Sequence, residues 1–155
     1  MVFTSHSLED TKKFATAWVA ETLAKRASAA STDSGGTNKA LVVGLYGDLG
    51  SGKTAFTQAV AQTLGINEPI TSPTFVIEKV YPLKNTTFTH LIHIDAYRLD
   101  KPEELARLGW GEVISNPDNI ILIEWPEKVA TIMPPDHTRL KFTFIDENTR
   151  TIESL

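Results

Sequence analysis

The octapeptide GDLGSGKT, residues 47–54, decides how the rest of this 155-residue chain is interpreted. It fits the pattern G-x-x-x-x-G-K-[ST], in which a glycine-rich loop places main-chain N–H groups around phosphate oxygens. The apolar run 40–46 precedes it and has the composition of a buried parallel strand. Residues 53–64 follow with apolar side chains at helical spacing, and Gly65 is typical of a helix end. The order strand, loop, helix therefore predicts a phosphate site rather than an accidental glycine-rich turn.

A loop of this kind binds a nucleotide mainly through main-chain dipoles. Its glycines allow backbone angles that a side chain obstructs, and the positive end of the following helix faces the anion. In this pattern Lys53 is expected to reach the β- and γ-phosphate oxygens, and the Thr54 hydroxyl to ligate Mg²⁺. The residues predicted to contact the nucleotide here are Gly47, Asp48, Leu49, Gly50, Ser51, Gly52, Lys53, Thr54 and Ala55.

Two acidic residues directly follow apolar runs that are predicted to be strands, Asp95 after 91–94 and Glu124 after 120–123. Ligands of open α/β sheets bind outside the carboxyl ends of the strands, so both acids are candidates for the Mg²⁺ site. Either acid is also a candidate for positioning the attacking water. Lys53, Asp95 and Glu124 are thus the predicted catalytic residues, although a single acid at a strand end is often only a solvated boundary.

Four further side chains near these motifs each have two interpretations. Thr74 either contacts the γ-phosphate or Mg²⁺, or is a turn hydroxyl, and Trp125 either stacks on the nucleotide or a partner, or closes the core. His93 is interpreted as a packed core histidine rather than a catalyst. Arg98 is interpreted as a surface ion-pair residue rather than a group that stabilises transition-state charge.

The remaining patterns predict an α/β fold with a mixed sheet, parallel core strands, added antiparallel strands and flanking helices. The other expected strands are 2–3 at a sheet edge, the antiparallel pairs 75–81 with 87–94 and 139–145 with 149–153, and the buried parallel strand 119–123. The polar segment 28–39 predicts a flexible surface loop within one domain spanning residues 1–155.

Two more helices are predicted from their capping signals. Ser7, with Asp10 three residues later, is expected to begin a helix that ends near Arg26. A second helix is expected after Asp100. Its first turn contains Pro102, its capping box uses Glu103, and Gly109 ends it.

The composition limits the class of protein. With 41% hydrophobic and 22% charged residues, the chain is expected to fold, and the absence of cysteine excludes disulfides and thiolate metal sites. The net charge of −4, without an evident basic face, argues against direct binding to nucleic-acid phosphates. The sequence contains no apolar run of about 18 residues and no export signal, so a cytoplasmic protein without a membrane span is expected.

In their order and spacing, these motifs resemble the TsaE (YjeE) family of bacterial ATPases, which act in tRNA threonylcarbamoyladenosine biosynthesis. The resemblance spans nearly the whole chain. The loop 28–39 looks longer than the family norm, and Phe75 stands where the family often has tyrosine. The matching segments are GDLGSGKT at 47–54, SPTF at 72–75, HIDAYRL at 93–99, PEEL at 102–105 with Gly109, and IEWPEK at 123–128.

The resemblance implies a P-loop NTPase fold that binds ATP and Mg²⁺ and hydrolyses ATP. It also implies the partners TsaD and TsaB, which transfer the threonylcarbamoyl group to adenosine 37 of tRNA, so that tRNA is reached through the complex. By the same resemblance, Thr54 and Glu124 hold Mg²⁺, and Asp95 and Trp125 are needed for activity. Thr11 and Arg150 match further nucleotide contacts of the family.

Two other functions stay open. The first is a small kinase, although such a kinase usually needs a lid with several arginines and the arginines after Lys53 are scattered. A GTPase fits less well, because the N-K-x-D motif that it would need after a late strand is missing. A nucleotide-gated interaction subunit, in which hydrolysis is incidental, overlaps with the family interpretation because the sequence supplies no clear arginine finger.

Overall fold

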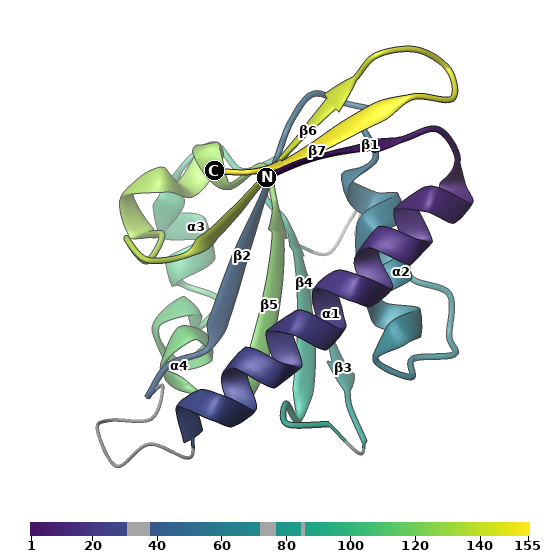
Figure 1. Cartoon of the computed structure of the whole chain (residues 1–155). Coiled ribbons are helices and arrows are strands. Elements are labelled where there is room, and N and C mark those ends of the chain that lie inside the picture. The colour runs from purple at the N-terminus through teal and green to yellow at the C-terminus, as the bar shows by residue number, and fades with distance from the viewer. Residues whose placement is uncertain (31–37, 72–76, 85) are drawn as a thin grey trace.

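One seven-stranded mixed sheet, with strand order β1-β7-β6-β2-β5-β4-β3, forms the centre of the protein. The structure is a computed structural model that describes residues 1–30, 38–71, 77–84 and 86–155. Helices α1 and α2 lie on one side of the sheet, and α3 and α4 lie on the other (Figure 1). The elements are β1 (Val2–Ser5), α1 (Leu8–Ala30), β2 (Leu41–Tyr46), α2 (Lys53–Thr63), β3 (Glu78–Pro82), β4 (His90–Asp95), α3 (Pro102–Ala106), α4 (Trp110–Ser115), β5 (Asn119–Glu124), the 3₁₀ helix η1 (Pro126–Ile132), β6 (Thr138–Phe144) and β7 (Arg150–Ser154).

The predicted mixed sheet is confirmed strand by strand. β2 pairs in parallel with β5 and β6, and β4 pairs in parallel with β5. The pairs β3–β4 and β6–β7 are antiparallel, as expected from the hairpin signals. β1 pairs antiparallel with β7 at the sheet edge, a pairing between the two chain ends that no local signal predicts. β4 begins at His90 rather than at residue 87, and residues 75 and 76 of the expected third strand lie outside the described residues.

The central strands β2, β4 and β5 are mainly apolar between their ends, as suits strands that are covered on both faces. On one face Ile120 and Leu122 pack into a core with α1 and α2, and on the other Ile121 and Ile123 pack into a core with α3, α4 and η1. This arrangement is typical of parallel sheets in α/β proteins. The parallel direction of β2, β4 and β5 places their carboxyl ends on the same side of the sheet, where the glycine-rich loop begins.

Helix α1 begins as predicted but extends further than expected. The main-chain N–H of Asp10 donates to the Ser7 hydroxyl (3.1 Å), and the N–H of His6 donates to the Asp10 carboxylate (3.1 Å). The helix runs to Ala30 instead of ending near Arg26, so residues 28–30 are not part of a loop. Alanines at this end favour the helix, and the Arg26 guanidinium holds it by donating to the carbonyls of Lys39 and Pro117.

A helix follows Asp100 as expected, but the predicted cap and the predicted end of this helix are wrong. Lys101 is the N-cap residue, and Glu104, not Glu103, accepts main-chain hydrogen bonds from Lys101 (2.9 Å) and Asp100 (2.8 Å). These bonds lower the pKa of Glu104. Gly109 has φ 86° and precedes a second short helix, α4, so its glycine conformation turns the chain between two helices.

None of the helices in the described part of the chain has the combination of length and hydropathy that a membrane-crossing helix requires.

Glu78, at the start of edge strand β3, is expected to cost stability at neutral pH. Its Oε2 is buried without a hydrogen-bond partner among the described residues, and burial raises the pKa of its carboxyl group. A carboxyl whose pKa is higher in the folded than in the unfolded state stabilises the fold when protonated and loses that contribution as pH rises. Glu78→Gln should therefore raise the melting temperature at pH 7 by roughly 2–4 °C, which corresponds to about 1 kcal/mol for a chain of this size.

The advantage of Glu78→Gln should disappear on acidification below the unfolded-state pKa of about 4.5, where the wild-type carboxyl is also neutral. Glu68→Gln, at an exposed position, is the control and should not change the melting temperature. A gain for Glu78→Gln that is the same at pH 4 and pH 7 would contradict desolvation as its cause.

Candidate functional site

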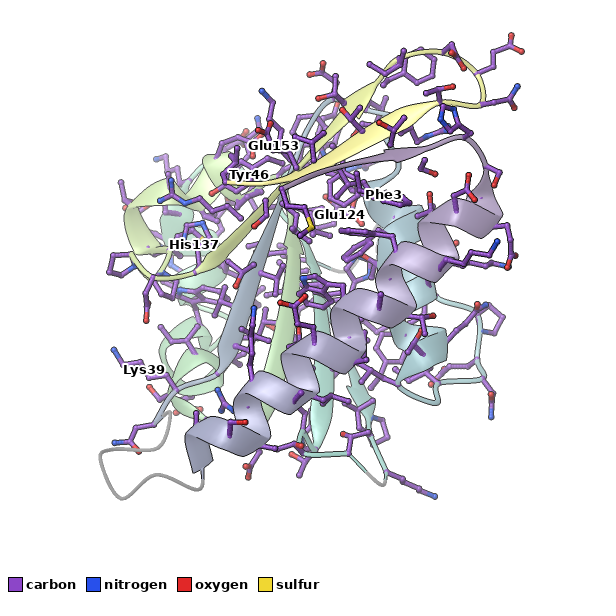
Figure 2. The ribbon with its side chains drawn as sticks, viewed as in Figure 1. Phe3, Lys39, Tyr46, Glu124, His137 and Glu153 are labelled. Carbon is purple, nitrogen blue, oxygen red and sulfur yellow. The ribbon has the colours of Figure 1, made fainter. Side chains whose placement is uncertain are left out.

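A cavity of about 940 Å³ lies where β2, β4 and β5 end and α2 begins. Figure 2 shows Glu124, the last residue of β5, and Tyr46, the last residue of β2, at the same end of the sheet. The cavity brings together segments that are distant in the sequence, including the loop before α2, the ends of β4 and β5, and the turns after β1 and β6. Its lining residues are Ser7, Leu8, Thr11, Leu49, Gly50, Gly52, Lys53, Thr54, Ala55, Ile77, Asp95, Tyr97, Arg98, Glu124, Trp125, Glu147, Asn148 and Arg150.

The glycine-rich loop has the curved backbone that its sequence predicts. Gly47, Gly50 and Gly52 have φ values of 135°, 76° and 105°, all in the range that side chains disfavour. Gly52 is the N-cap residue of α2, so the first N–H groups of that helix face the loop. A run of main-chain N–H groups at a helix N-terminus is an anion-binding arrangement.

Gly47 is the position in this loop with the least room for a side chain. A Cβ there would lie 2.2 Å from the Phe142 carbonyl oxygen and 2.9 Å from the Ser51 hydroxyl. We expect Gly47→Ala to lower the free energy of unfolding by roughly 3 kcal/mol or more, because backbone strain and overlap add. Gly65→Ala is the matched control, since Gly65 also has positive φ (89°) but open space around it.

Gly65→Ala should lower the free energy of unfolding by only about 1–2 kcal/mol, the cost of the left-handed conformation alone. Urea denaturation of both variants measures the difference. Equal losses for the two variants would show that the close approach of Phe142 to Gly47 does not matter.

Lys53 lies inside the loop rather than in solvent. Its side chain is 4% exposed, and its ammonium donates to the carbonyl oxygens of Gly47 (2.6 Å) and Asp48 (2.9 Å). The ammonium also lies 4.2 Å from the centre of the Trp125 ring. Burial lowers the pKa of Lys53, while the charge of Glu124 opposes this shift. The site therefore holds a poorly hydrated positive charge at the base of the loop.

Thr54 and Glu124 meet at the centre of the cavity. The Thr54 hydroxyl donates to both carboxylate oxygens of Glu124, at 3.0 and 3.1 Å, although the two residues are 70 positions apart in sequence. Glu124 is 3% exposed, and its Oε1 also lies 2.9 Å from Nε2 of His93. The structure thus joins the threonine of the loop to the acid at the end of β5.

Asp95 and Trp125 flank this pair. Asp95 ends β4 directly beside Glu124 in the parallel register, and its Oδ1 accepts the main-chain N–H of Tyr97 (3.0 Å). Trp125 has φ 59°, a left-handed conformation, and its ring lies 5.0 Å from that of Tyr97. Such backbone strain in a non-glycine residue costs about 1–3 kcal/mol and is found most often at functional sites.

Thr11 and Arg150 also line the cavity, although they come from opposite ends of the chain. The Thr11 hydroxyl is hydrogen-bonded to that of Ser5 (2.8 Å). The Arg150 side chain lies next to Gly52, since a Cβ on that glycine would be 3.0 Å from Arg150 Cδ. Antiparallel pairing of β1 with β7 brings the two segments together.

The remaining predicted residues differ in their position: three loop residues lie away from the cavity lining, one residue lies outside the described residues, and one lines the cavity. The carbonyls of Gly47 and Asp48 hold Lys53, and Ser51 is buried with no partner for its hydroxyl in the described part of the chain. Thr74 lies outside the described residues. Arg98, interpreted from the sequence as a surface ion-pair residue, lines the cavity.

Several lining residues had no signal in the sequence strong enough to predict them. Ser7 directly precedes α1, Leu8 is its first residue, and Glu147 and Asn148 lie in the turn between β6 and β7. Residue types like these are ordinary at helix starts and turns, and only the pairing of distant strands brings them to the site. Tyr97 was part of a recognised motif, HIDAYRL, but received no role from it.

The oxygen donors of the site suit Mg²⁺ only together with a phosphate ligand. Among residues 1–30, 38–71, 77–84 and 86–155, no three His, Asp or Glu side chains are grouped so as to hold a metal. Thr54, Glu124 and Asp95 instead supply a hydroxyl and two carboxylates. Mg²⁺ is commonly held by one or two carboxylates, substrate phosphates and water, so this donor set fits a nucleotide-bound ion.

Comparison with known proteins gives one consistent family. The family model described as "Threonylcarbamoyl adenosine biosynthesis protein TsaE" matches residues 5–152. Proteins described as "tRNA threonylcarbamoyladenosine biosynthesis protein TsaE" from Borreliella burgdorferi, Rickettsia felis and Haemophilus influenzae are 45%, 39% and 38% identical over 92, 110 and 111 residues. These matches cover 59%, 70% and 72% of this chain. The chain spans 64%, 61% and 68% of the three relatives' own lengths.

A solved structure supports the fold. The crystal structure of YdiB from Bacillus subtilis superposes with a TM-score of 0.69 at 25% sequence identity. The superposition covers 99% of this chain and 83% of that one. The predicted P-loop NTPase fold, with its mixed sheet and flanking helices, is confirmed by this similarity and by the strand order.

Proposed function

Because the chain belongs to the TsaE family of threonylcarbamoyl adenosine biosynthesis proteins, we propose that it is a Mg²⁺-dependent ATPase of tRNA modification. The contact between Thr54 and Glu124 is the observation that carries this proposal, because it joins the end of the phosphate loop to an acid at a strand end. The same pairing of a P-loop threonine with a carboxylate holds Mg²⁺ in P-loop NTPases.

In this proposal each residue has a distinct task. Main-chain N–H groups of the loop and of the start of α2 bind the phosphates, and Lys53 contributes its charge to the β- and γ-phosphates. Thr54, Glu124 and Asp95 are the residues that would hold Mg²⁺. The ion supplies charge neutralisation on the phosphate oxygens. Asp95 or Glu124 orients the attacking water.

The outer part of the cavity is suited to the rest of the nucleotide and to a partner. Thr11 and Arg150 line the wall formed by the two chain ends, and we assign them to the nucleoside side of ATP. Leu49 and Tyr97 line the cavity and are 77% and 47% exposed. Exposed apolar side chains beside a polar site are typical of a surface that another protein covers.

We assign that covering role to the TsaB–TsaD pair and expect tRNA to be reached through the complex in the cytoplasm. The net charge of −4 supports this, because direct binding of nucleic acid usually needs a basic face. A partner on the exposed rim would exclude water and strengthen the electrostatic interactions within the site. Hydrolysis by the isolated chain is therefore expected to be slow.

The test measures ATP hydrolysis by the isolated protein, with the TsaB–TsaD pair, and with the pair plus tRNA. We expect the pair to raise turnover by at least about tenfold, a barrier change of about 1.4 kcal/mol. Equal rates with and without the partners would contradict the proposed assembly. Transfer of labelled phosphate to a small acceptor, without release of inorganic phosphate, would instead indicate a kinase.

A further inference from the structure

We propose that His93 is a positioning residue that fixes the Glu124 carboxylate for the bound Mg²⁺ ion. This inference deepens the proposed function and rests on it, because it concerns the same metal–nucleotide site. His93 is absent from the cavity lining, whereas Glu124 is part of it. The histidine therefore acts through the glutamate and not on the nucleotide itself.

The parallel register of β4 and β5 creates the contact. His93 lies opposite Leu122, and Glu124 is two residues further along β5, so both side chains extend from the same face of the sheet. His93 is fully buried, and its Nε2 lies 2.9 Å from Glu124 Oε1. The imidazole thus contacts the carboxylate from within the core, whereas Glu124 itself also lines the cavity.

The hydrogen bond has a defined direction. A glutamate that ligates Mg²⁺ does so as a carboxylate, which only accepts hydrogen bonds, so in the proposed site Nε2 of His93 carries the hydrogen and donates it to Oε1. Thr54 does not select between the two oxygens, because its hydroxyl lies 3.0 Å from one and 3.1 Å from the other. His93 breaks this symmetry, because Oε1 contacts both His93 and Thr54 whereas Oε2 contacts Thr54.

Core packing alone explains the histidine less well. Its Nδ1 is buried and has no hydrogen-bond partner in the described part of the chain. Leaving a buried polar atom unpaired is unfavourable, and an apolar side chain would fill the same space without that cost. The bond to Glu124 is what the imidazole provides and a leucine does not. Partners that orient a ligating carboxylate commonly change metal affinity by about 10–100-fold when removed.

The test compares His93→Leu with His93→Gln. Leucine fills the core without a donor, whereas the glutamine amide reaches approximately to the Nε2 position and keeps the donor. For each protein, the affinity for a non-hydrolysable ATP analogue is measured calorimetrically with and without Mg²⁺, and Mn²⁺ binding to the complex is followed by electron paramagnetic resonance. The readout is the factor by which the metal strengthens nucleotide binding.

We expect His93→Leu to reduce that factor by about tenfold, while metal-free nucleotide affinity changes by less than about twofold. His93→Gln should restore the factor to within about threefold of the wild type. In a Glu124→Ala background, His93→Leu should produce no further loss. If His93→Leu does not fold, His93→Asn replaces it, because the asparagine amide is too short to reach Oε1.

If the folded His93→Leu or His93→Asn variant shows the same strengthening of nucleotide binding by Mg²⁺ as the wild type, the inference about His93 is overturned while the proposed function stands. Equal losses in the leucine and glutamine variants would also overturn it, since packing and not the donor would then be responsible. A full additional loss in the Glu124→Ala background would likewise exclude action through Glu124. A wild-type protein whose nucleotide binding is insensitive to Mg²⁺ would overturn the proposed function as well, which separates the two failures.

Discussion

Lys53→Ala is expected to weaken ATP binding at least about a hundredfold, a loss of about 2.7 kcal/mol. Lys53 is 4% exposed and its ammonium is held by two loop carbonyls, so its charge is already largely desolvated before a phosphate arrives. Charge-assisted hydrogen bonds from such a group to phosphate oxygens are stronger than those from a hydrated surface lysine. The substitution removes the only cation that the loop itself contains.

The measurement is the dissociation constant for a fluorescent ATP analogue in the presence of Mg²⁺. Lys13→Ala is the matched control, because Lys13 carries the same charge on the exposed face of α1. It should bind the analogue like the wild type, and both variants should keep the wild-type circular dichroism spectrum. If Lys53→Ala bound the analogue within about threefold of the wild type, a value worth only about 0.7 kcal/mol, the phosphate site would have to lie elsewhere.

The parts of the fold that sequence reasoning predicted correctly are those whose signals are local. The loop 47–54, the apolar strand before it and the hairpin of β6 and β7 each depend on neighbouring residues. The predicted end of α1 and the predicted cap of α3 were wrong for different reasons. The first depends on contacts between distant segments, and the second on a choice between two adjacent glutamates. Arg26 holds the end of α1 against segments far along the chain, and Glu104 rather than Glu103 accepts the capping bonds.

The residues of the candidate site also divide into those with a local signal in the sequence and those that depend on contacts between distant segments. Thr54 was predicted from the glycine-rich loop pattern, and Asp95 and Glu124 because parallel strands end on the same side of a sheet; the structure places all three around one cavity. The contact between His93 and Glu124 was not predicted, since it requires the exact pairing of β4 with β5. An isolated histidine within a strand is ordinarily core packing, and only the register changes that interpretation.

Glu124→Ala is expected to reduce Mg²⁺-dependent ATP turnover by at least about a hundredfold, equivalent to about 2.7 kcal/mol of barrier. The carboxylate is buried and accepts a hydrogen bond from the Thr54 hydroxyl, so its loss removes a ligand that the metal needs in the proposed site. Metal-free nucleotide binding should change by less than about threefold, because the main-chain groups of the loop and Lys53 stay in place.

The same substitution has a separate cost in stability. It leaves the Thr54 hydroxyl and His93 Nε2 without their acceptor, which should lower the free energy of unfolding by about 1–3 kcal/mol. Glu124→Gln separates the two effects, since it keeps an acceptor oxygen and the side-chain volume but removes the charge. It should recover most of the stability but little of the turnover, whereas Glu68→Gln at an exposed position should change neither.

Turnover and melting temperature, measured on the same four proteins, therefore distinguish a metal ligand from a structural acid. If turnover followed stability, so that Glu124→Gln regained both, Glu124 would act only by holding Thr54 and His93 in place. If turnover stayed low in Glu124→Gln while stability returned, the charge itself would be required. Since an ionised carboxylate is the donor that Mg²⁺ prefers to a neutral amide, the second result is the one expected.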